Sequence, residues 1–489
     1  MSEKFISDLL TSNGQSISEH RRHDFKEFCT DVRTLEIINE IRIKESQIVE
    51  NWKRKKRLAD LLQQSWPIGN GTVNVAYSAK LDFQLLSLND ISIEKVEGSG
   101  DIGLVYEINE KSILIHGLPS KNGDFHIMVH FRFRGANESE PLSTKKVILV
   151  INPDPKTLWK NLDSDKEDIY WKKDDFAKAG ILGDKHVVGV SKRGRSHQHV
   201  GSFRDDHFDF KYFDKTEWSI VVVSDGAGGA KFSRKGSELA CAGVIEYFDG
   251  ILNSTNSNTE SDLFIELEQQ LRKANLIEGE LPIDLANLSK KALYPAVLHV
   301  NKKIKAHADE AHAVTPNIFD DAKKPIEHFH ATLIFCLFKK IKTGYVLLTF
   351  GVGDCPIAVI GADEKKSMLI NTLDVGEFGG GTRFITQTEI YHSKEIPMSS
   401  RFNCEFVSDF SYMFLMSDGI YDPKFIVEEN LKKLEKWQDF IADLNGKNDD
   451  EACVEFNPDN ENIQIQLSNW MDFWSTGEHD DRTLVVVYS

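Results

Sequence analysis

Residues 218–229 read WSIVVVSDGAGG, a hydrophobic run that ends in one aspartate and a glycine-rich turn. The run has the length and the β-branched content of a buried strand. Glycine allows the backbone to come close to a ligand and to present a carbonyl group to it. A tight turn alone would need glycine but not Asp225. The stretch therefore predicts a strand that delivers a carboxylate to a functional site.

Four further stretches place acidic residues where a hydrophobic run begins or ends. They are SYMFLMSDGIYD (411–422), VLLTFGVGDC (346–355), GEHDDRTLVVV (477–487) and GRSHQHVGSFRDDH (194–207). With the first stretch, they give five acidic positions: Asp205-Asp206, Asp225, Asp354, Asp418 and Asp480-Asp481. Two strands that each end in Ser-Asp-Gly, at Asp225 and Asp418, are difficult to explain by turn geometry alone.

Carboxylates gathered in one place repel each other, at about 4 kcal/mol for a pair 4 Å apart at an effective dielectric near 20. Such a cluster is reasonable only around cations, and a ligand set made of oxygen alone suits magnesium or manganese rather than zinc. The sequence thus predicts a site for two or more hard metal ions, which is typical of phosphate chemistry.

The composition is that of an ordinary globular protein with two or three domains. The chain has 489 residues, 40% of them hydrophobic and 28% charged, and a formal net charge of −17. This negative charge disfavours a general nucleic-acid or anionic-membrane binder. No apolar run approaches the roughly 18 residues of a membrane span, and the first residues do not match a secretory signal. The six cysteines are scattered, so we expect free thiols and a cytoplasmic protein.

The pattern of apolar residues changes along the chain and predicts four segments. Residues 1–66 have helical spacing, and 67–155 have short alternating strands typical of a small β-sandwich, similar to an immunoglobulin-like module. Residues 156–180 are polar and are expected to be a linker, and 181–489 mix strands with separate helices, which indicates an α+β domain. The basic run at 53–57 is read as a solvated helix face.

Other chemistries fit less well. Residues 98–103 spell GxGxxG, but an alternating run follows where a dinucleotide loop would open a helix, so a hairpin turn is predicted. No cysteine has an arginine six positions later, as a cysteine-dependent phosphatase would need. The sequence also has no HExxH zinc motif and no GxxxxGK[ST] nucleotide motif.

Taken together and in chain order, the five acidic stretches resemble the motif string of the metal-dependent protein phosphatases, the type 2C Ser/Thr phosphatases. The resemblance covers about residues 185–489. The opening GRSHxxxG form is similar to a bacterial branch of that family. Within that branch, INPDPKTLW (151–159) and SDGIYDPKF (417–425) resemble phosphatases found beside a protein kinase and a von Willebrand A-type protein in tellurite-resistance-type stress clusters.

The resemblance implies a four-layer αββα sandwich with the metal ions, manganese or magnesium, at one end. Carried over by position, Asp225 would bridge two ions and Gly226 would offer its carbonyl group. Asp418 and Asp481 would hold one ion, and Asp205 would lie near the other with Asp206 beside it. Asp354 and Asp418 would form a third site. These residues are Asp205, Asp206, Asp225, Gly226, Asp354, Asp418 and Asp481.

Four features depart from the family pattern. The family has Glu-Asp or Gln-Asp where this chain has Asp205-Asp206, and the expected phosphate-binding arginine has two candidates, Arg195 and Arg204. The usual Asp-Asn before the last strand is Asp481-Arg482 here, which makes Arg482 a further unplaced cation. The family's Gly-Thr-Thr-Leu is His330-Ala-Thr-Leu here, a change expected to touch no ligand. His197 and His479 are the nearest candidates by sequence to protonate the leaving alkoxide.

The predicted activity is hydrolysis of phosphoserine or phosphothreonine in proteins by water that two metal ions activate. The implied partners are a phosphorylated protein and, in the stress-cluster branch, a protein kinase or a von Willebrand A-type protein. The alternative is an inactive phosphatase fold that binds a phosphoprotein or a kinase. Residues 1–155 carry no recognisable chemistry and are predicted to position the enzyme on a partner.

Overall fold

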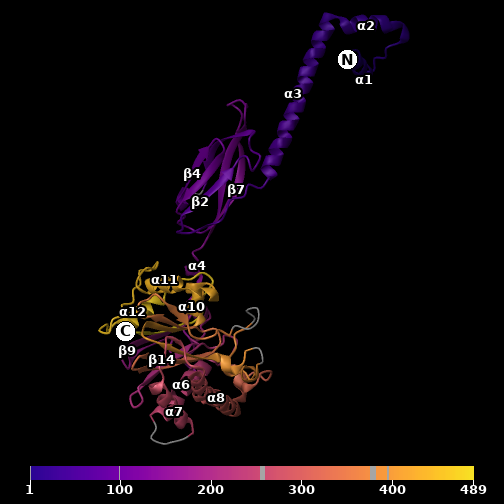
Figure 1. Cartoon of the computed structure of the whole chain (residues 1–489). Coiled ribbons are helices and arrows are strands. Elements are labelled where there is room, and N and C mark those ends of the chain that lie inside the picture. The colour runs from indigo at the N-terminus through magenta and orange to yellow at the C-terminus, as the bar shows by residue number, and fades with distance from the viewer. Residues whose placement is uncertain (1, 99, 254–258, 375–380, 394–395) are drawn as a thin grey trace. The chain divides into compact units, whose positions relative to one another are not determined.

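The protein divides into two compact units, residues 1–158 and 159–489, in a computed structural model (Figure 1). The structure describes residues 2–98, 100–253, 259–374, 381–393 and 396–489. Its mixture of helices and β-sheets confirms the α+β class predicted from the sequence. The two units are described separately below.

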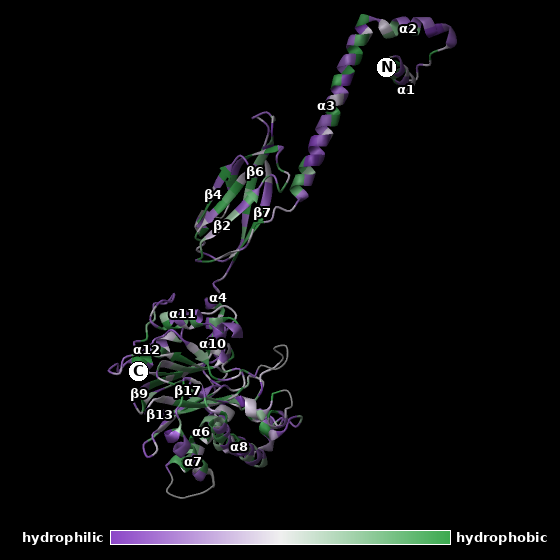
Figure 2. Ribbon diagram, in the orientation of Figure 1, coloured by the Kyte–Doolittle hydropathy of each residue, from purple (hydrophilic) through white to green (hydrophobic). Residues whose placement is uncertain are grey.

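Three helices open the first unit: α1 (Ser2–Ser12), α2 (Arg22–Thr30) and α3 (Val32–Gln63). Asp31 caps α3, because its carboxylate accepts the Thr34 N–H at 3.1 Å. Figure 2 shows hydrophobic and hydrophilic residues interspersed along α3. Within the basic run, Lys53, Arg54 and Arg57 form ion pairs with carboxylates of this same unit.

Two small sheets follow these helices and share one hydrophobic core. One has the order β1-β7-β6-β3 and the other the order β2-β5-β4. The strands are β1 (Gly71–Thr72), β2 (Tyr77–Asp82), β3 (Ile91–Glu97), β4 (Leu104–Asn109), β5 (Ser112–Gly117), β6 (Gly123–Phe133) and β7 (Ser143–Asn152). In β6, Ile127, Val129 and Phe131 are fully buried while the residues between them are not. This period-two pattern is that of a sheet with one face on the core.

The GxGxxG stretch does not open a long helix, and it is not a hairpin turn either. Residues Gly100–Ile102 form a single 3₁₀ turn, and β4 begins at Leu104. The segment connects β3, which pairs with β6, to β4, which pairs with β5. It therefore carries the chain from one sheet to the other, a long-range pairing that the local sequence did not reveal.

The second unit contains two six-stranded sheets in which every strand pairing is antiparallel. The first sheet has the order β10-β11-β13-β14-β17-β12 and the second has the order β16-β15-β18-β19-β9-β8. The strands are β8 (Asp175–Leu182), β9 (Lys185–Lys192), β10 (His207–Phe213), β11 (Trp218–Ser224), β12 (Gly279–Glu280), β13 (Leu333–Ile341), β14 (Gly344–Val352), β15 (Ile357–Gly361), β16 (Ser367–Leu369), β17 (Phe402–Val407), β18 (Phe410–Met416) and β19 (Arg482–Tyr488).

Helices cover the two sheets on different sides (Figure 1). The longer helices α6 (Ser233–Leu252), α7 (Thr259–Lys273) and α8 (Ile283–Val314) share one core cluster with the first sheet. Helices α10 (Asp418–Phe425), α11 (Leu434–Leu444) and α12 (Ile463–Trp470) share another with the second sheet. A third cluster joins residues of both sheets.

Strand β11 explains why the opening stretch of the sequence is continuously hydrophobic. Ile220 and Val222 belong to the cluster on the helix side, whereas Val221 and Val223 belong to the cluster between the sheets. All seven residues of β11 are buried, as they are in β19. Each fully buried valine or isoleucine contributes about 1.5–3 kcal/mol, so these strands hold their ends rigidly in place.

Residues 156–180, expected to be a linker, mostly form part of the second unit. The boundary between the units falls between Leu158 and Trp159. Trp159 packs against His479 with ring centroids 4.3 Å apart, and Lys172 donates to the Asp206 carbonyl oxygen at 2.7 Å. The segment then enters β8, the outermost strand of the second sheet. The polar composition of residues 156–180 gives no indication of these contacts.

Within the described residues, no helix is long and apolar enough to span a membrane. All six cysteines are free thiols, and Cys453 alone among them is exposed.

Candidate active site

Asp225 lies directly after β11, on a turn that a neighbouring loop holds in place. Its N–H donates to the Thr332 hydroxyl at 2.8 Å, and its carbonyl oxygen accepts the Thr332 N–H at 2.8 Å. Thr332, which fixes the backbone of Asp225, is shared with the family's Gly-Thr-Thr-Leu, so these contacts do not involve the side chains of the two changed residues, His330 and Ala331. At Gly226, a Cβ atom would lie 2.6 Å from the Asp205 carbonyl oxygen, so only glycine fits there.

Asp418 is the first residue of α10 and follows β18. Ser417 anchors the junction, since its N–H donates to the Thr483 carbonyl oxygen and its hydroxyl accepts the Thr483 N–H, both at 3.0 Å. A Cβ atom at Gly419 would lie 2.0 Å from the Asp481 carbonyl oxygen. The second Ser-Asp-Gly stretch is thus explained by the close passage of the β19 entry segment.

A cavity of about 420 Å³ opens where these strand ends meet. Its lining residues are Asp225, Gly226, Ala227, Gly228, Gly229, Ala230, Lys323, Glu327, His330, Asp354, Thr382, Phe384, Asp418 and Asp480. The structure therefore brings together four of the predicted site residues: Asp225, Gly226, Asp354 and Asp418. Sequence reasoning did not single out Lys323, Glu327 or Thr382, which come from turns and irregular segments without a motif.

The electrostatics of the cavity favour a bound cation. Burial and then the charges of Asp418, Asp206 and Asp354 raise the pKa of Asp225 well above its ordinary value. Burial and then Asp354 and Asp480 do the same for the pKa of Asp418. Asp354 is only 8% exposed and its Oδ1 has no hydrogen-bond partner among the described residues, while Oδ2 accepts from Thr382 at 2.6 Å. Cations among these oxygens would remove both the repulsion and the unmet bonding capacity.

Asp205 and Asp206 lie beside the cavity and are buried. The Asp206 Oδ2 accepts from the Thr483 hydroxyl at 2.7 Å. Burial and then the charge of Asp481 raise the pKa of Asp206 to about 6 and that of Asp205 to about 7. The charge of Asp206 in turn contributes to the raised pKa of Asp225.

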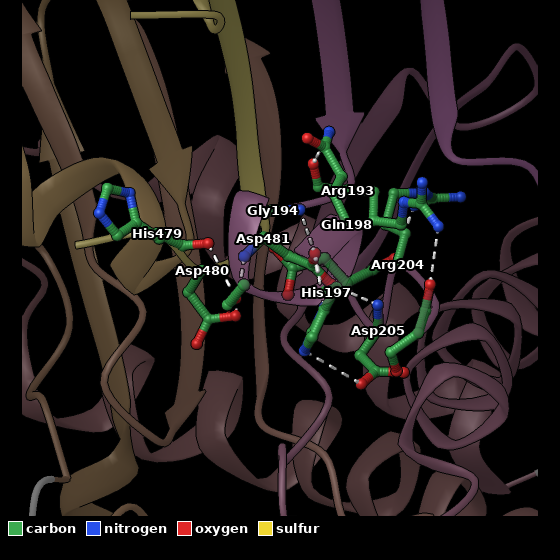
Figure 3. Close-up of polar contacts among 12 residues, drawn as sticks. Arg193, Gly194, His197, Gln198, Arg204, Asp205, His479, Asp480 and Asp481 are labelled. Carbon is green, nitrogen blue, oxygen red and sulfur yellow. Dashed lines mark hydrogen bonds and ion pairs between the residues drawn. The ribbon is translucent and has the colours of Figure 1, made fainter. Parts of the chain in front are cut away.

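Asp480 and Asp481 are neighbours in the chain but occupy different environments (Figure 3). Asp480 is exposed and lines the cavity. The buried Asp481 accepts the Gly194 N–H at 2.6 Å and the His197 Nδ1 at 2.9 Å, and its other oxygen accepts the Asp205 N–H. The family resemblance implied that Asp481 holds a metal ion, whereas in the structure Asp480 lines the cavity and both Asp481 oxygens accept hydrogen bonds from protein donors.

His197 belongs to this buried group rather than to the cavity lining (Figure 3). Burial lowers its pKa, but the hydrogen bond and charge of Asp481 and the charge of Asp205 outweigh burial, and its pKa is about 10. The Nε2 atom lies 3.9 Å from the Asp205 carboxylate. His197 is thus a cation at neutral pH that holds two carboxylates in place. His479 lies between the rings of Trp159 and Trp474 instead.

Both arginines predicted to grip phosphate are directed at the protein. The Arg204 guanidinium is buried and donates to the carbonyl oxygens of Lys173 and Asp206 and to the Ser191 hydroxyl. Arg195 donates to the Asp472 carbonyl oxygen at 2.7 Å and lies over the Trp474 ring. Neither side chain lines the cavity.

Comparison with known proteins identifies the family of this chain. The profile described as "Protein phosphatase 2C" matches residues 193–470, which is more than half of the chain. The chain therefore belongs to the protein phosphatase 2C family. The matched segment contains Asp225, Asp354 and Asp418, and ends before Asp480. A comparison with curated proteins gave no match.

Solved structures of bacterial phosphatases are among those similar to this chain. A point mutant of a bacterial serine phosphatase is 15% identical, with a TM-score of 0.34, and the match covers 62% of this chain and 98% of that one. The Ser/Thr phosphatase Stp1 from Staphylococcus aureus is also 15% identical, with a TM-score of 0.33 and 64% and 97% covered. The catalytic domain of PstP in complex with two manganese ions is 13% identical, with a TM-score of 0.33 and 64% and 98% covered.

Proposed function

We propose that this protein is a metal-dependent phosphatase that hydrolyses phosphoserine or phosphothreonine in proteins. The observation that supports this most strongly is the convergence of Asp225, Asp354, Asp418 and Asp480, from four separate strand ends, on one cavity. The buried Asp354 Oδ1, which has no partner within the described part of the chain, and the raised pKa values of these carboxyl groups are what we expect of a site built for divalent cations.

In this proposal, Asp225, Asp418 and Asp480 hold two manganese or magnesium ions, and Asp354 with Asp418 can hold a third. When bound, the ions supply a nucleophilic water and offset charge on the phosphoryl oxygens. The charge of Asp206 acts on the Asp225 carboxyl group, and Thr332 fixes the Asp225 backbone. His197 and Asp481 position Asp205 and are not themselves at the reaction centre.

Three finer assignments belong to the same proposal. The two sheets with their flanking helices correspond to a four-layer αββα sandwich, and the small sheets of the first unit to an immunoglobulin-like module. The motifs at 151–159 and 417–425 favour the bacterial stress-cluster branch, with a protein kinase or a von Willebrand A-type protein as partner. The alternative function is an inactive module that binds a phosphoprotein. Unlike the proposed enzyme, such a module would not hydrolyse the phosphate ester.

The test is a phosphatase assay on the full chain, stripped of metal and then supplied with Mn²⁺ or Mg²⁺. We expect metal-stimulated release of phosphate from phosphoserine and phosphothreonine peptides, with two or three ions bound per chain by metal analysis. In Asp418→Asn, turnover should fall by at least about a hundredfold. Because burial, Asp354 and Asp480 disfavour the charged form of Asp418, the metal-free variant should melt at a higher temperature than the wild type.

The outcomes separate the two functions. Metal binding and phosphopeptide binding without turnover would favour the inactive module. A wild-type chain that binds no divalent ion at all would contradict both, since each depends on the same carboxylates. An Asp418→Asn variant whose metal-free form is less stable than the wild type would contradict the electrostatic account of the cavity.

A further inference from the structure

A phosphate monoester carries two negative charges, and the walls of the cavity must offset them together with the metal ions. The arginines nearest to the acidic cluster do not reach into it. Besides Arg195 and Arg204, Arg234 donates to the carbonyl oxygens of Tyr170 and Lys231 and pairs with Asp168 at 2.5 Å. These guanidinium groups fasten loops to each other, and none of them lines the cavity.

Two other cations close to the cavity are also directed elsewhere. Arg383 lies between the lining residues Thr382 and Phe384, but its guanidinium faces Asp374 at 3.5 Å and Ser393 at 3.5 Å. Lys172 donates to the carbonyl oxygens of Asp206 and Arg234. Neither side chain is part of the cavity lining.

Lys323 is the exception among the described cations. It is exposed, it lines the cavity, and its Nζ lies 3.3 Å from the Gly229 carbonyl oxygen. Gly229 belongs to the turn that follows Asp225, so the ammonium group lies over the Asp225 turn. In the part of the chain that the structure describes, the Lys323 Nζ forms no ion pair with a carboxylate, and its hydrogen bond is donated to the Gly229 carbonyl oxygen. Its charge is therefore available to a ligand.

The backbone around Lys323 holds this side chain at the cavity mouth. The Lys323 N–H donates to the Asp320 carbonyl oxygen at 3.0 Å, which closes a turn. The 3₁₀ helix η4 (Pro325–Phe329) begins two residues later and carries Glu327, a second lining residue. The Phe232 N–H donates to the His328 carbonyl oxygen at 2.7 Å and ties η4 to the start of α6.

We propose that Lys323 binds the phosphoryl group of the substrate, in the place that the family resemblance gives to an arginine. This inference rests on the proposed phosphatase function. A lysine binds phosphate as a point charge on a flexible stem, whereas arginine offers a planar fork with two parallel donors. Lys323 therefore attracts the phosphoryl group and can bind it in substrates of different orientation. The residues at the floor of the cavity fix the position of the phosphoryl group.

The test compares Lys323→Met and Lys323→Arg with the matched control Lys324→Met, in the full chain loaded with Mn²⁺. Lys324 is the neighbouring exposed lysine and does not line the cavity. Each substitution to methionine removes one positive charge from the same turn, so long-range electrostatic effects are equal. The measurements are KM and kcat for a phosphoserine peptide, inhibition by inorganic phosphate, Mn²⁺ affinity by calorimetry, and melting temperature.

We expect Lys323→Met to raise KM and to weaken phosphate inhibition by on the order of tenfold, the effect of losing one hydrogen bond to a charged group. Lys323→Arg should remain within about threefold of the wild type. Mn²⁺ affinity and melting temperature should be unchanged in all variants, and Lys324→Met should behave as the wild type.

The inference is overturned if Lys323→Met and Lys324→Met change KM and phosphate inhibition equally, because the effect would then be general charge. It is also overturned if Lys323→Met alters Mn²⁺ affinity as strongly as it alters phosphate binding. In either case, activity of the wild type would still support the proposed phosphatase function. A Mn²⁺-loaded wild type that neither hydrolyses the peptide nor binds inorganic phosphate would contradict both the phosphatase function and the role of Lys323.

Discussion

Asp480 and Asp481 differ in their surroundings because these two consecutive side chains point in different directions just before β19. One carboxylate faces the cavity, and the other faces inward, where it meets the N–H groups of Gly194 and Asp205 and the imidazole of His197. Burial raises the Asp481 pKa, but the His197 hydrogen bond and charge outweigh it, and the net pKa is below the ordinary value. Asp480 has a raised pKa, first from burial and then from Asp481.

This contrast predicts opposite phenotypes for two neighbouring substitutions. Asp480→Asn should weaken Mn²⁺ binding by at least about tenfold and should not lower the melting temperature of the metal-free protein, because the side chain is exposed and its charge opposes that of Asp418. Asp481→Asn should lower the free energy of unfolding by about 2–4 kcal/mol, because one amide oxygen cannot accept from three buried donors and the amide adds donors of its own. Calorimetric Mn²⁺ titration and thermal melting of both variants check this.

The prediction is wrong if the effects of the two substitutions on Mn²⁺ binding and on stability are reversed. Asp481→Asn with wild-type stability and weak Mn²⁺ binding would mean that Asp481 is the ligand, as the sequence alone suggested. Asp480→Asn with normal Mn²⁺ binding would point to the same conclusion.

The sequence predicted that Asp225, Asp354 and Asp418 lie together, and they line one cavity, but the resemblance named Asp481 where the structure has Asp480 at the cavity. Ser-Asp-Gly after a buried strand identified Asp225 and Asp418 because local rules decide where a strand ends and where glycine is required. Whether Asp480 or Asp481 faces the cavity depends on the register of β19 against β9, a contact between residues far apart in the chain. Lys323 had no motif at all, since its place depends on how a loop packs over the Asp225 turn.

At the scale of elements, the pairing of β12 with β17 brings two like charges together. The short strand β12 pairs antiparallel with β17, and the register places Glu280 directly opposite Glu405. Burial and then the charge of Glu280 raise the Glu405 pKa above its ordinary value. Like charges directly opposite each other in a sheet are destabilising. The folded state therefore holds the Glu405 proton more tightly than the unfolded chain does.

This pairing predicts a pH-dependent gain from Glu405→Gln. Below the unfolded pKa, near 4.5, Glu405 is protonated in both states and the substitution should change little. As pH rises through the raised folded pKa, wild-type stability falls, because the unfolded state releases its proton more easily. At pH 7–8 the variant should be more stable by about 0.2–1 kcal/mol. Thermal melts at pH 4 and pH 8 measure the difference.

Glu280→Gln is the matched control, because it removes the other charge of the same pair from the exposed side. Glu280→Gln should give part of the same gain in stability, and this gain should depend on pH in the same way. A gain that is equal at pH 4 and pH 8 would show that side-chain packing, and not charge, is responsible.

At the scale of the whole molecule, the boundary between the units was the part of the fold that composition described least well. Residues 159–174 are polar, yet they hold Trp159 against His479 and Lys172 against the backbone of Asp206. The edge strand β8 follows and pairs with β9 over its full length. Such contacts join a polar segment to distant strands, so hydropathy along the chain gives no sign of them.

Two fragments that differ only in this segment test the boundary. The fragment 159–489 keeps all of the second unit and should fold and hydrolyse a small aryl phosphate with Mn²⁺ at a rate close to that of the full chain. The fragment 181–489 loses most of β8, Trp159 and Lys172, which exposes β9 as an unprotected edge. It should melt at a clearly lower temperature or aggregate. An equally stable and active 181–489 fragment would show that 159–180 is a linker after all, and an inert but folded 159–489 fragment would give residues 1–158 a part in catalysis.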